Sequence, residues 1–200
     1  ALYPRQSGQH HRRARSHEGA GAVCFGQGHG AAMSAVMSAD KLLRPQLSEA
    51  TRNRVTLAAM TQDDLDTVMA IEQTAYSHPW TRGNFRDSLN PLFEAQCLWL
   101  DGELLGYFLA MRGFEEMHLL NITVAPAHQG QGWGHMMLDA LTLLSRQSGA
   151  QWLWLEVRQS NLRALQVYER YGFKQVSIRK DYYPAGRQQR EHAVVMSLKL

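Results

Sequence analysis

The sequence predicts an α/β fold in which helices flank a mixed β-sheet. Short apolar runs alternate with amphipathic segments from about residue 54 to the end of the chain. The pair Asp101-Gly102 between two apolar runs is typical of a tight hairpin, which makes those two strands antiparallel. A glycine-rich loop at 129–134 then separates a strand from a helix and a further strand. That order requires a right-handed crossover and at least one parallel strand pair.

The first half of this region contains two helices and four strands. A strand at 54–59 precedes a helix that Thr61 is predicted to cap, with Asp64 three residues later completing a capping box. The chain breaks at 79–80, and a short second helix is expected from Thr81 to Leu89. Three more strands are expected as an antiparallel meander, over residues 94–100, 104–111 and 117–124.

The second half alternates between helices and strands. A helix is expected from about His135 to Gln147, followed by an apolar strand at 152–157. Ser160 or Asn161 caps the next helix, and Gly172 ends it. Two strands, expected to pair with each other, complete the domain over residues 173–180 and 193–200.

Composition excludes several classes of protein. The chain has 200 residues, of which 44% are hydrophobic, enough for a folded domain plus a tail. Its longest apolar run, 104–111, is far shorter than the roughly 20 residues that cross a membrane. Two cysteines, Cys24 and Cys97, are too few for a disulfide scaffold or for a zinc site of their own. A reduced, cytoplasmic protein is therefore expected, with Cys97 in the core.

The excess positive charge is confined to the first quarter of the chain. Residues 1–50 hold 6 basic and 3 acidic residues, whereas 51–200 hold 15 of each. Because 1–36 contain few large apolar side chains, we expect 1–50 to be a disordered basic leader or linker and 51–200 to be the folded domain. Met33 or Met37 is the expected start of translation. The balanced domain gives no electrostatic argument for nucleic-acid binding, although an RNA-binding tail remains an alternative.

The loop at 129–134, with the sequence Gln-Gly-Gln-Gly-Trp-Gly, is a candidate phosphate site. Backbone N–H groups beside a helix N-terminus favour an anion, and glycine lacks the Cβ that would keep a phosphate away. An ordinary strand-to-helix turn is an equally weighted alternative. The loop lacks the Gly-Lys-Ser/Thr and Gly-x-Gly-x-x-Gly patterns, which excludes the common nucleoside triphosphate and dinucleotide loops.

The next strand carries a candidate base. Alternation places Glu156 on the same face as Trp152 and Trp154, with the aliphatic residues of the strand on the other face. Partial desolvation beside indoles is expected to raise the pKa of Glu156 and make it a better base near neutral pH. The alternative is an ordinary Glu at the open end of the strand, paired with Arg158 or with water.

The following helix adds two candidates on one face. Asn161 and Tyr168 are seven residues apart, which is two helical turns. Asn161 can cap the helix and hydrogen-bond an amide ligand, and Tyr168 can donate a phenolic proton. Half-buried packing is the alternative for Tyr168. Further along, Tyr182 and Tyr183 either line a peptide groove or pack within a hairpin.

These motifs, in this order, resemble the GCN5-related N-acetyltransferases, and more finely their RimI type, which acetylates N-termini of ribosomal proteins. The resemblance covers about residues 54–200. It rests on the pattern Gln-x-x-Gly-x-Gly followed by Asn-x-x-Ala-x-x-x-Tyr-x-x-x-Gly-Phe and on the segments 79–80, 121–124, 153–158 and 181–184. It implies a splayed central sheet that binds acetyl-CoA.

The resemblance also implies a role for each matching position. Glu156 would accept a proton from the amine, directly or through water, and Tyr168 would protonate the departing thiolate. The positions implied to hold acetyl-CoA are Ile122, Thr123, Val124, Gly130, Gln131, Gly132, Trp133, Gly134, His135 and Asn161. Relatives often carry Arg where Gly130 or His135 stands and an aliphatic residue where Trp133 stands, so weaker neutralisation of the diphosphate charge is expected.

The expected function is transfer of an acetyl group from acetyl-CoA to the N-terminal α-amine of a protein, foremost the eighteenth small-subunit ribosomal protein (bS18 type). No metal, nucleic acid or membrane is implied, and a cytoplasmic monomer is expected. Two alternatives stay open: acetylation of a small amine or a Lys side chain, and a CoA-binding module without catalysis.

Overall fold

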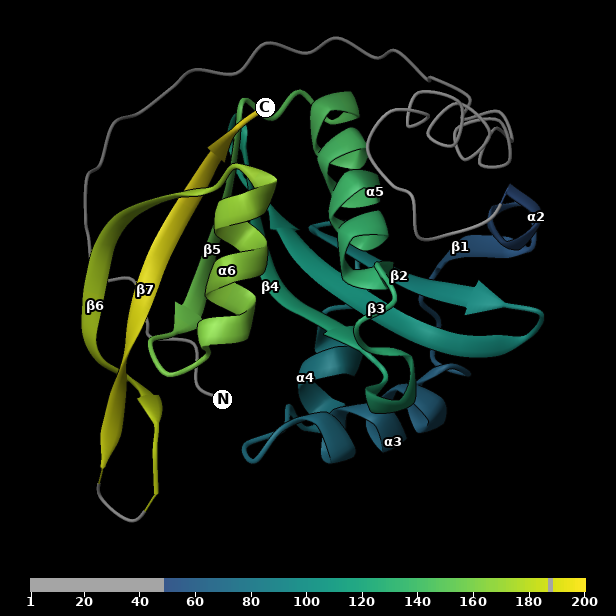
Figure 1. Ribbon diagram of the computed structural model, residues 1–200, viewed down its shortest axis with the longest axis horizontal. Helices are drawn as coiled ribbons and strands as arrows, with labels where there is room; N and C mark the ends of the chain where they lie inside the picture. Colours follow the sequence, from purple (N-terminus) through teal and green to yellow (C-terminus); the bar gives the residue numbers. More distant parts are fainter. Residues whose placement is uncertain (1–48, 187–188) are drawn as a thin grey trace, which may run out of the picture.

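The computed structural model describes residues 49–186 and 189–200. Its seven strands form one sheet in the order β1-β2-β3-β4-β5-β7-β6 (Figure 1). The strands are β1 (Val55–Ala59), β2 (Phe93–Leu100), β3 (Glu103–Arg112), β4 (Glu116–Val124), β5 (Trp152–Arg158), β6 (Lys174–Pro184) and β7 (Arg190–Lys199). The helices are α2 (Glu49–Arg52), α3 (Leu65–Ala75), α4 (Arg82–Asp87), the 3-10 turn η1 (Pro126–His128), α5 (Trp133–Gln147) and α6 (Leu162–Tyr171).

The sheet is mixed, as the sequence predicts. β4 and β5 pair in parallel, and the other five strand pairs are antiparallel. The helix α5 makes the crossover between the two parallel strands, which is the connection that the glycine loop and the following helix indicate.

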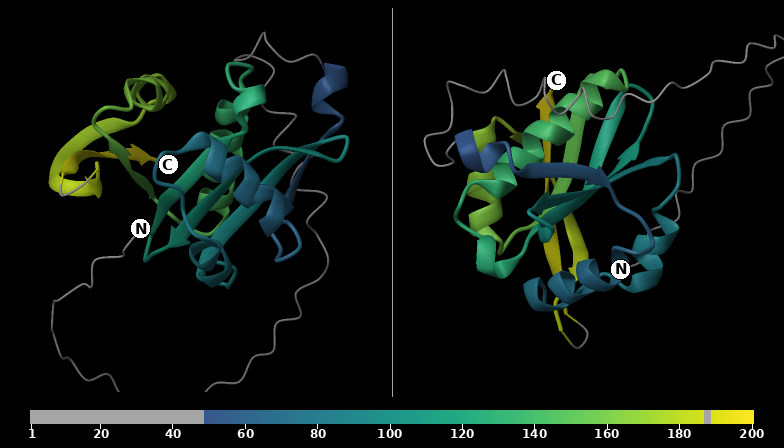
Figure 2. Two further views of the ribbon diagram at one scale, coloured as in Figure 1. Left: turned by 90° about the horizontal axis from the view of Figure 1, so that it is seen from below. Right: turned by 90° about the vertical axis from the view of Figure 1, so that its right-hand side faces the viewer.

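Helices α5 and α6 cover one face of the sheet and α3 and α4 the other (Figure 2). A hydrophobic core lies under each pair of helices. The larger core packs α5 and α6 against the sheet and includes the fully buried Met137 and Leu141. The smaller core packs α3 and α4 against β2 and β3 around Phe85 and Tyr107. Cys97 belongs to the smaller core and is 0% exposed, which confirms its expected place.

The predicted hairpin between β2 and β3 is confirmed. Leu100 pairs with Glu103 across the two-residue turn. Asp101 has φ 50° and Gly102 has φ 85°, and this pair of positive values is what a twist-matched hairpin turn requires.

The start of α3 differs from the prediction. The helix begins at Leu65 with Asp64 as its cap, three residues later than a cap at Thr61. The Asp64 carboxylate accepts from both the backbone N–H (2.7 Å) and the hydroxyl (2.8 Å) of Thr61. The two residues therefore interact, but Asp64 closes a turn before the helix instead of standing at its third position.

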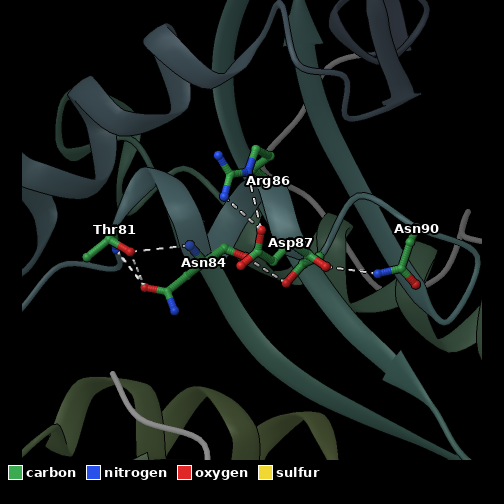
Figure 3. Close-up of polar contacts among 6 residues, drawn as sticks. Thr81, Asn84, Arg86, Asp87 and Asn90 are labelled. Carbon is green, nitrogen blue, oxygen red and sulfur yellow. Dashed lines mark hydrogen bonds and ion pairs between the residues drawn. The ribbon is translucent and has the colours of Figure 1, made fainter.

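The helix α4 starts at the predicted cap. The Thr81 hydroxyl accepts from the Asn84 backbone N–H, and the Asn84 side chain accepts from the Thr81 backbone N–H, which makes a capping box (Figure 3). The helix is short and ends at Asp87, whose backbone carbonyl accepts from the Asn90 side chain at 2.8 Å (Figure 3).

In the second half, some boundaries move. The helix α5 begins at Trp133, two residues before the predicted start, and follows Gly132 at φ 92°. Asn161, not Ser160, caps α6, because its side chain accepts from the Ala164 backbone N–H at 3.1 Å. The strands β6 and β7 pair as predicted, and β6 runs on to Pro184. Tyr182 and Tyr183 therefore lie in a strand.

The expected leader, the start at Met33 or Met37, and Cys24 lie outside the described residues. Among the helices that the structure describes, none is long and apolar enough to cross a membrane.

Candidate active site

The strands β4 and β5 part halfway along their length. They pair from Glu116 with Trp152 to Leu119 with Leu155, after which β4 pairs only with β3 and β5 only with β7. Figure 1 shows the two strands side by side near the top of the view and diverging below. Among the described residues, no strand pairs with Leu120–Val124 on the side that β5 has left.

A β-bulge lies at the parting. Leu119 pairs with Ala110 and Asn121 with Leu109, so Leu120 has no partner on β3. One extra residue bends the strand and reverses which side chains face each core. Leu119, before the bulge, packs in the core under α5 and α6. Ile122, three positions later, returns to the same face because of the extra residue.

After the bulge, Asn121 and Thr123 face α3 and join a buried polar network. The carboxylate of Glu72, which is 1% exposed, accepts from Asn121 Nδ2 at 3.3 Å, from the Trp80 backbone N–H at 2.8 Å and from the Tyr107 hydroxyl. Nearly every acceptor position of this carboxylate is therefore used. The network ties the loop between α3 and α4 to the parted strand.

The same network reaches the edge of the parting through Tyr76. The Thr123 hydroxyl donates to Asn121 Oδ1 at 2.8 Å, and the Tyr76 hydroxyl lies 2.9 Å from Thr123 Oγ1 and 3.3 Å from the Ile122 carbonyl oxygen. Burial, above all, raises the pKa of Tyr76. The phenol therefore remains a neutral donor at the parted edge.

The glycine loop turns through two glycines in the left-handed region. Gly130 and Gly132 have φ 81° and 92°, a region that residues with a Cβ rarely adopt. Trp133 is 3% exposed, and its indole N–H donates to Gln131 Oε1 at 3.2 Å. The Trp133 side chain is thus a core residue, which leaves its backbone as the part available to a ligand. The His135 ring lies 5.6 Å from that of Tyr171.

An arginine that the sequence pattern did not single out lies beside this loop. Arg163 Nη1 donates to Gln129 Oε1 at 3.0 Å, and a Cβ at Gly130 would lie 3.8 Å from Arg163 Nη2. The guanidinium supplies positive charge next to Gly130 of the loop. Only the folding of α6 against the loop reveals it, because 33 residues separate Arg163 from Gly130.

Glu156 has partners other than those expected. Its side chain is 8% exposed, with Oε2 2.6 Å from His118 Nε2 and Oε1 3.2 Å from Arg179 Nη2. Burial raises the pKa of Glu156, but the hydrogen bond and charge of His118 and the charge of Arg179 outweigh it, so the pKa is lowered. The expected raised pKa is wrong, because His118 and Arg179, which no local pattern reveals, lie beside the carboxylate.

Arg158 does not pair with Glu156. Its guanidinium lies 3.2 Å from Glu191 and 4.5 Å from the centre of the Tyr183 ring. The Tyr183 hydroxyl in turn donates to the Glu156 backbone carbonyl at 3.0 Å. Tyr182 and Tyr183 pack edge to face, with ring centres 5.0 Å apart. Hairpin packing is thus present, and their role in a peptide groove stays a prediction.

Tyr168 lies in α6 with its ring edge to face against Phe173, at 5.7 Å. Burial, and then the neighbouring Tyr76 and Tyr183, raise the pKa of Tyr168. Its hydroxyl makes no hydrogen bond to the residues that the structure describes. Tyr168 therefore carries a neutral phenol whose hydroxyl no other described residue engages.

Cys97 is excluded as a nucleophile. Burial raises the pKa of its thiol to about 12, so the reactive thiolate is absent at neutral pH. Within the described ranges, no group of three or more His, Cys, Asp or Glu side chains is arranged to hold a metal ion.

Comparison with known proteins agrees with this architecture. The model of the acetyltransferase (GNAT) family matches residues 65–173, and the chain belongs to that family. The fold and the matched region define it as an N-acetyltransferase.

Named relatives refine the comparison. The chain is 37% identical over 134 residues to the ribosomal protein bS18-alanine N-acetyltransferase of Haemophilus influenzae, covering 67% of this chain and 91% of the relative. It is 34% identical over 143 residues to the Escherichia coli K12 enzyme of the same name, covering 72% and 96%.

Solved structures of similar proteins have the same fold. The crystal structure of the ribosomal-protein-S18-alanine N-acetyltransferase from Escherichia coli superposes with a TM-score of 0.68 at 33% identity, covering 72% of this chain and 93% of that one. Ard1 from Thermoplasma volcanium, at 22% identity and a TM-score of 0.66, covers 74% and 98% and shows the shared fold.

Proposed function

We propose that this protein transfers the acetyl group of acetyl-CoA to the N-terminal α-amine of a ribosomal protein of the bS18 type. Relatives with that activity in their names match over more than nine tenths of their own length. The observation that carries the proposal is the position of Glu156, a nearly buried carboxylate beside the parting of β4 and β5.

The parted edge and the glycine loop fit acetyl-CoA. Leu120–Val124 offer an edge without a strand partner on one side, which suits the amide-bearing arm of the co-substrate. The loop at 130–134 offers backbone N–H groups at the start of α5, which suit a diphosphate. Arg163 adds a positive charge there, and the cap uses only Oδ1 of Asn161, so its Nδ2 has no hydrogen-bond partner among residues 49–186 and 189–200 and can donate to a ligand.

Glu156 and Tyr168 handle the protons of the reaction. Acetyl-CoA supplies an acetyl group activated as a thioester. Glu156 accepts a proton from the attacking amine, directly or through water, and an amine with a pKa of about 8 requires only a modest base. Tyr168 donates its proton to the thiolate that leaves, and its raised pKa keeps the phenol protonated until then.

We also propose that the acetyltransferase domain occupies residues 51–200. The family model covers 65–173, and the described structure extends that match by β1 on one side and by β6 and β7 on the other. β7 is part of the site's framework, because it pairs with β5 along the whole of that strand.

The proposal is tested by measuring the mass of the peptide after the reaction. The full chain is incubated with acetyl-CoA and a peptide that carries the N-terminus of bS18 with alanine first. Matched reactions contain the same peptide with a blocked N-terminus and an internal Lys, or a small polyamine. The expected result is the mass increase of one acetyl group on the free N-terminus alone. Acetylation of only the Lys or the polyamine, or of nothing, contradicts the proposal.

A further inference from the structure

His118 and Glu156 form a close polar pair beside the point where β4 and β5 part. Nε2 and Oε2 are 2.6 Å apart, and the side chains are 24% and 8% exposed. An ionised carboxylate only accepts hydrogen bonds, so His118 Nε2 carries the hydrogen. His118 occupies the rung opposite Trp154, one rung before the last pair of the two strands.

The other oxygen of Glu156 has a different environment. Arg179 Nη2 lies 3.2 Å from Oε1 as an ion pair, but Oε1 is buried and accepts no aligned hydrogen bond within the described part of the chain. The remaining titratable neighbours are Tyr182 and Tyr183 of β6. Burial raises the pKa of both phenols, so they stay neutral and add no charge beside Glu156. One carboxylate oxygen is thus held by a hydrogen bond, whereas the other faces only the charge of Arg179 and keeps its lone pairs unused by aligned donors in the described part of the chain.

We propose that His118 is a positioning residue for Glu156: it holds Oε2, leaves Oε1 as the proton acceptor, and through its own charge sets how strongly Glu156 attracts the proton. This inference rests on the proposed function. In the step concerned, the amine N–H bond breaks, an O–H bond forms at Oε1, and the proton then passes to solvent.

The charge of His118 affects how readily Glu156 takes a proton. A positive imidazole 2.6 Å from Oε2 stabilises the carboxylate and opposes its protonation. A neutral imidazole keeps the hydrogen bond and removes that opposition. An imidazole is the side chain that ordinarily changes charge between about pH 5 and 8. When the ring beside it is neutral, Glu156 is the stronger base.

A purely structural hydrogen bond predicts something different. A donor without titration, such as the amide of Gln, then serves as well as His. His118→Gln keeps an N–H that can reach Oε2, but it has no charge to lose, whereas His118→Leu removes both. The two variants therefore separate the hydrogen bond from the titration.

The experiment measures kcat and KM separately for the alanine-first peptide and acetyl-CoA, from about pH 5.5 to about pH 9. We expect His118→Gln to flatten the part of the kcat profile that rises through the imidazole range, with KM for acetyl-CoA unchanged. We expect His118→Leu to lower kcat about 10–100-fold, as loss of an orienting outer partner does at metal-bound histidines. A wild-type pH profile in His118→Gln overturns the inference.

A second measurement works on the unmodified side chain, in case a variant folds poorly. The imidazole protons of His118 are followed by NMR against pH in the wild type and in Glu156→Gln. We expect the pH midpoint of this titration to be lower in Glu156→Gln than in the wild type, because the negative partner is lost. An unchanged midpoint overturns the inference. Unchanged turnover in Glu156→Gln instead refutes the base of the proposed function. If Glu156→Gln loses turnover while His118→Gln keeps the wild-type pH profile, the role of His118 is refuted and the role of Glu156 as base stands.

Discussion

Leu119 of β4 and Leu155 of β5 are the last pair of residues that join the two halves of the sheet. Both are buried in the core under α5 and α6, at 4% and 1% exposure. The next residue of each strand does not take part in this pairing. In β4 it is Leu120, the extra residue of the bulge, and in β5 it is Glu156, whose side chain is a carboxylate. The end of one strand pairing therefore places the carboxylate beside an edge that a ligand can occupy.

Tyr168→Phe is expected to slow turnover about 10²–10⁴-fold while the fold stays intact, because the ring and its packing on Phe173 remain. The measurement is steady-state kcat together with the thermal unfolding midpoint. Tyr171→Phe is the matched control, since its hydroxyl, 3.0 Å from that of Thr142, serves packing of α6 on α5. Equal losses in both variants contradict the role of Tyr168.

Gly132→Ala is expected to weaken binding of CoA several-fold. A Cβ at φ 92° costs about 1–2 kcal/mol, and relief of that strain shifts the N–H groups of the loop. Gly149→Ala is the control, because it imposes the same strain at φ 84°, with no heavy atom within 4 Å of the new Cβ and away from the loop. Calorimetric titration with CoA distinguishes them. An unchanged Kd in Gly132→Ala removes the loop from the binding site.

Arg163→Gln is expected to raise KM for acetyl-CoA and to leave KM for S-acetylpantetheine, which lacks phosphates, unchanged. The guanidinium lies beside Gly130, so its loss removes positive charge from the loop alone. The difference is expected to shrink in high salt, since Arg163 is exposed. An equal effect on both thioesters shows that Arg163 does not contact phosphate.

Glu72→Ala is expected to lower the free energy of unfolding by about 3 kcal/mol or more, because it leaves two buried donors and one part-buried donor without an acceptor. Tyr107→Phe removes one donor only and is expected to cost about 1–2 kcal/mol. Urea unfolding measures both. A loss from Glu72→Ala no larger than that from Tyr107→Phe contradicts the network.

The lowered pKa of Glu156 predicts how stability depends on pH. A carboxylate whose pKa is lower in the folded state contributes stability above its ordinary value of 4.5, and this contribution is lost as the pH falls through the folded value. The wild type is therefore expected to exceed Glu156→Gln in stability at about pH 6, with the gap closing in acid below 4.5. A gap that widens in acid contradicts the lowered pKa.

The sequence by itself determined the features that depend on neighbours along the chain. The alternation of β5, the Asp101-Gly102 hairpin, the helix cap at Thr81 and the glycines of the loop follow from strand period, turn geometry and local hydrogen bonds. Together these were enough to predict the mixed sheet and to select Glu156 and Tyr168 as candidates.

Only the tertiary structure decided the features that depend on residues far apart. His118 lies 38 residues from Glu156, and Arg163 lies 34 residues from Gln129, so no local pattern announces either contact. The sign of the pKa shift of Glu156 changed for this reason, since desolvation is readable from neighbouring indoles whereas the opposing charges arrive from β4 and β6. The bulge at Leu120 is likewise a product of strand pairing.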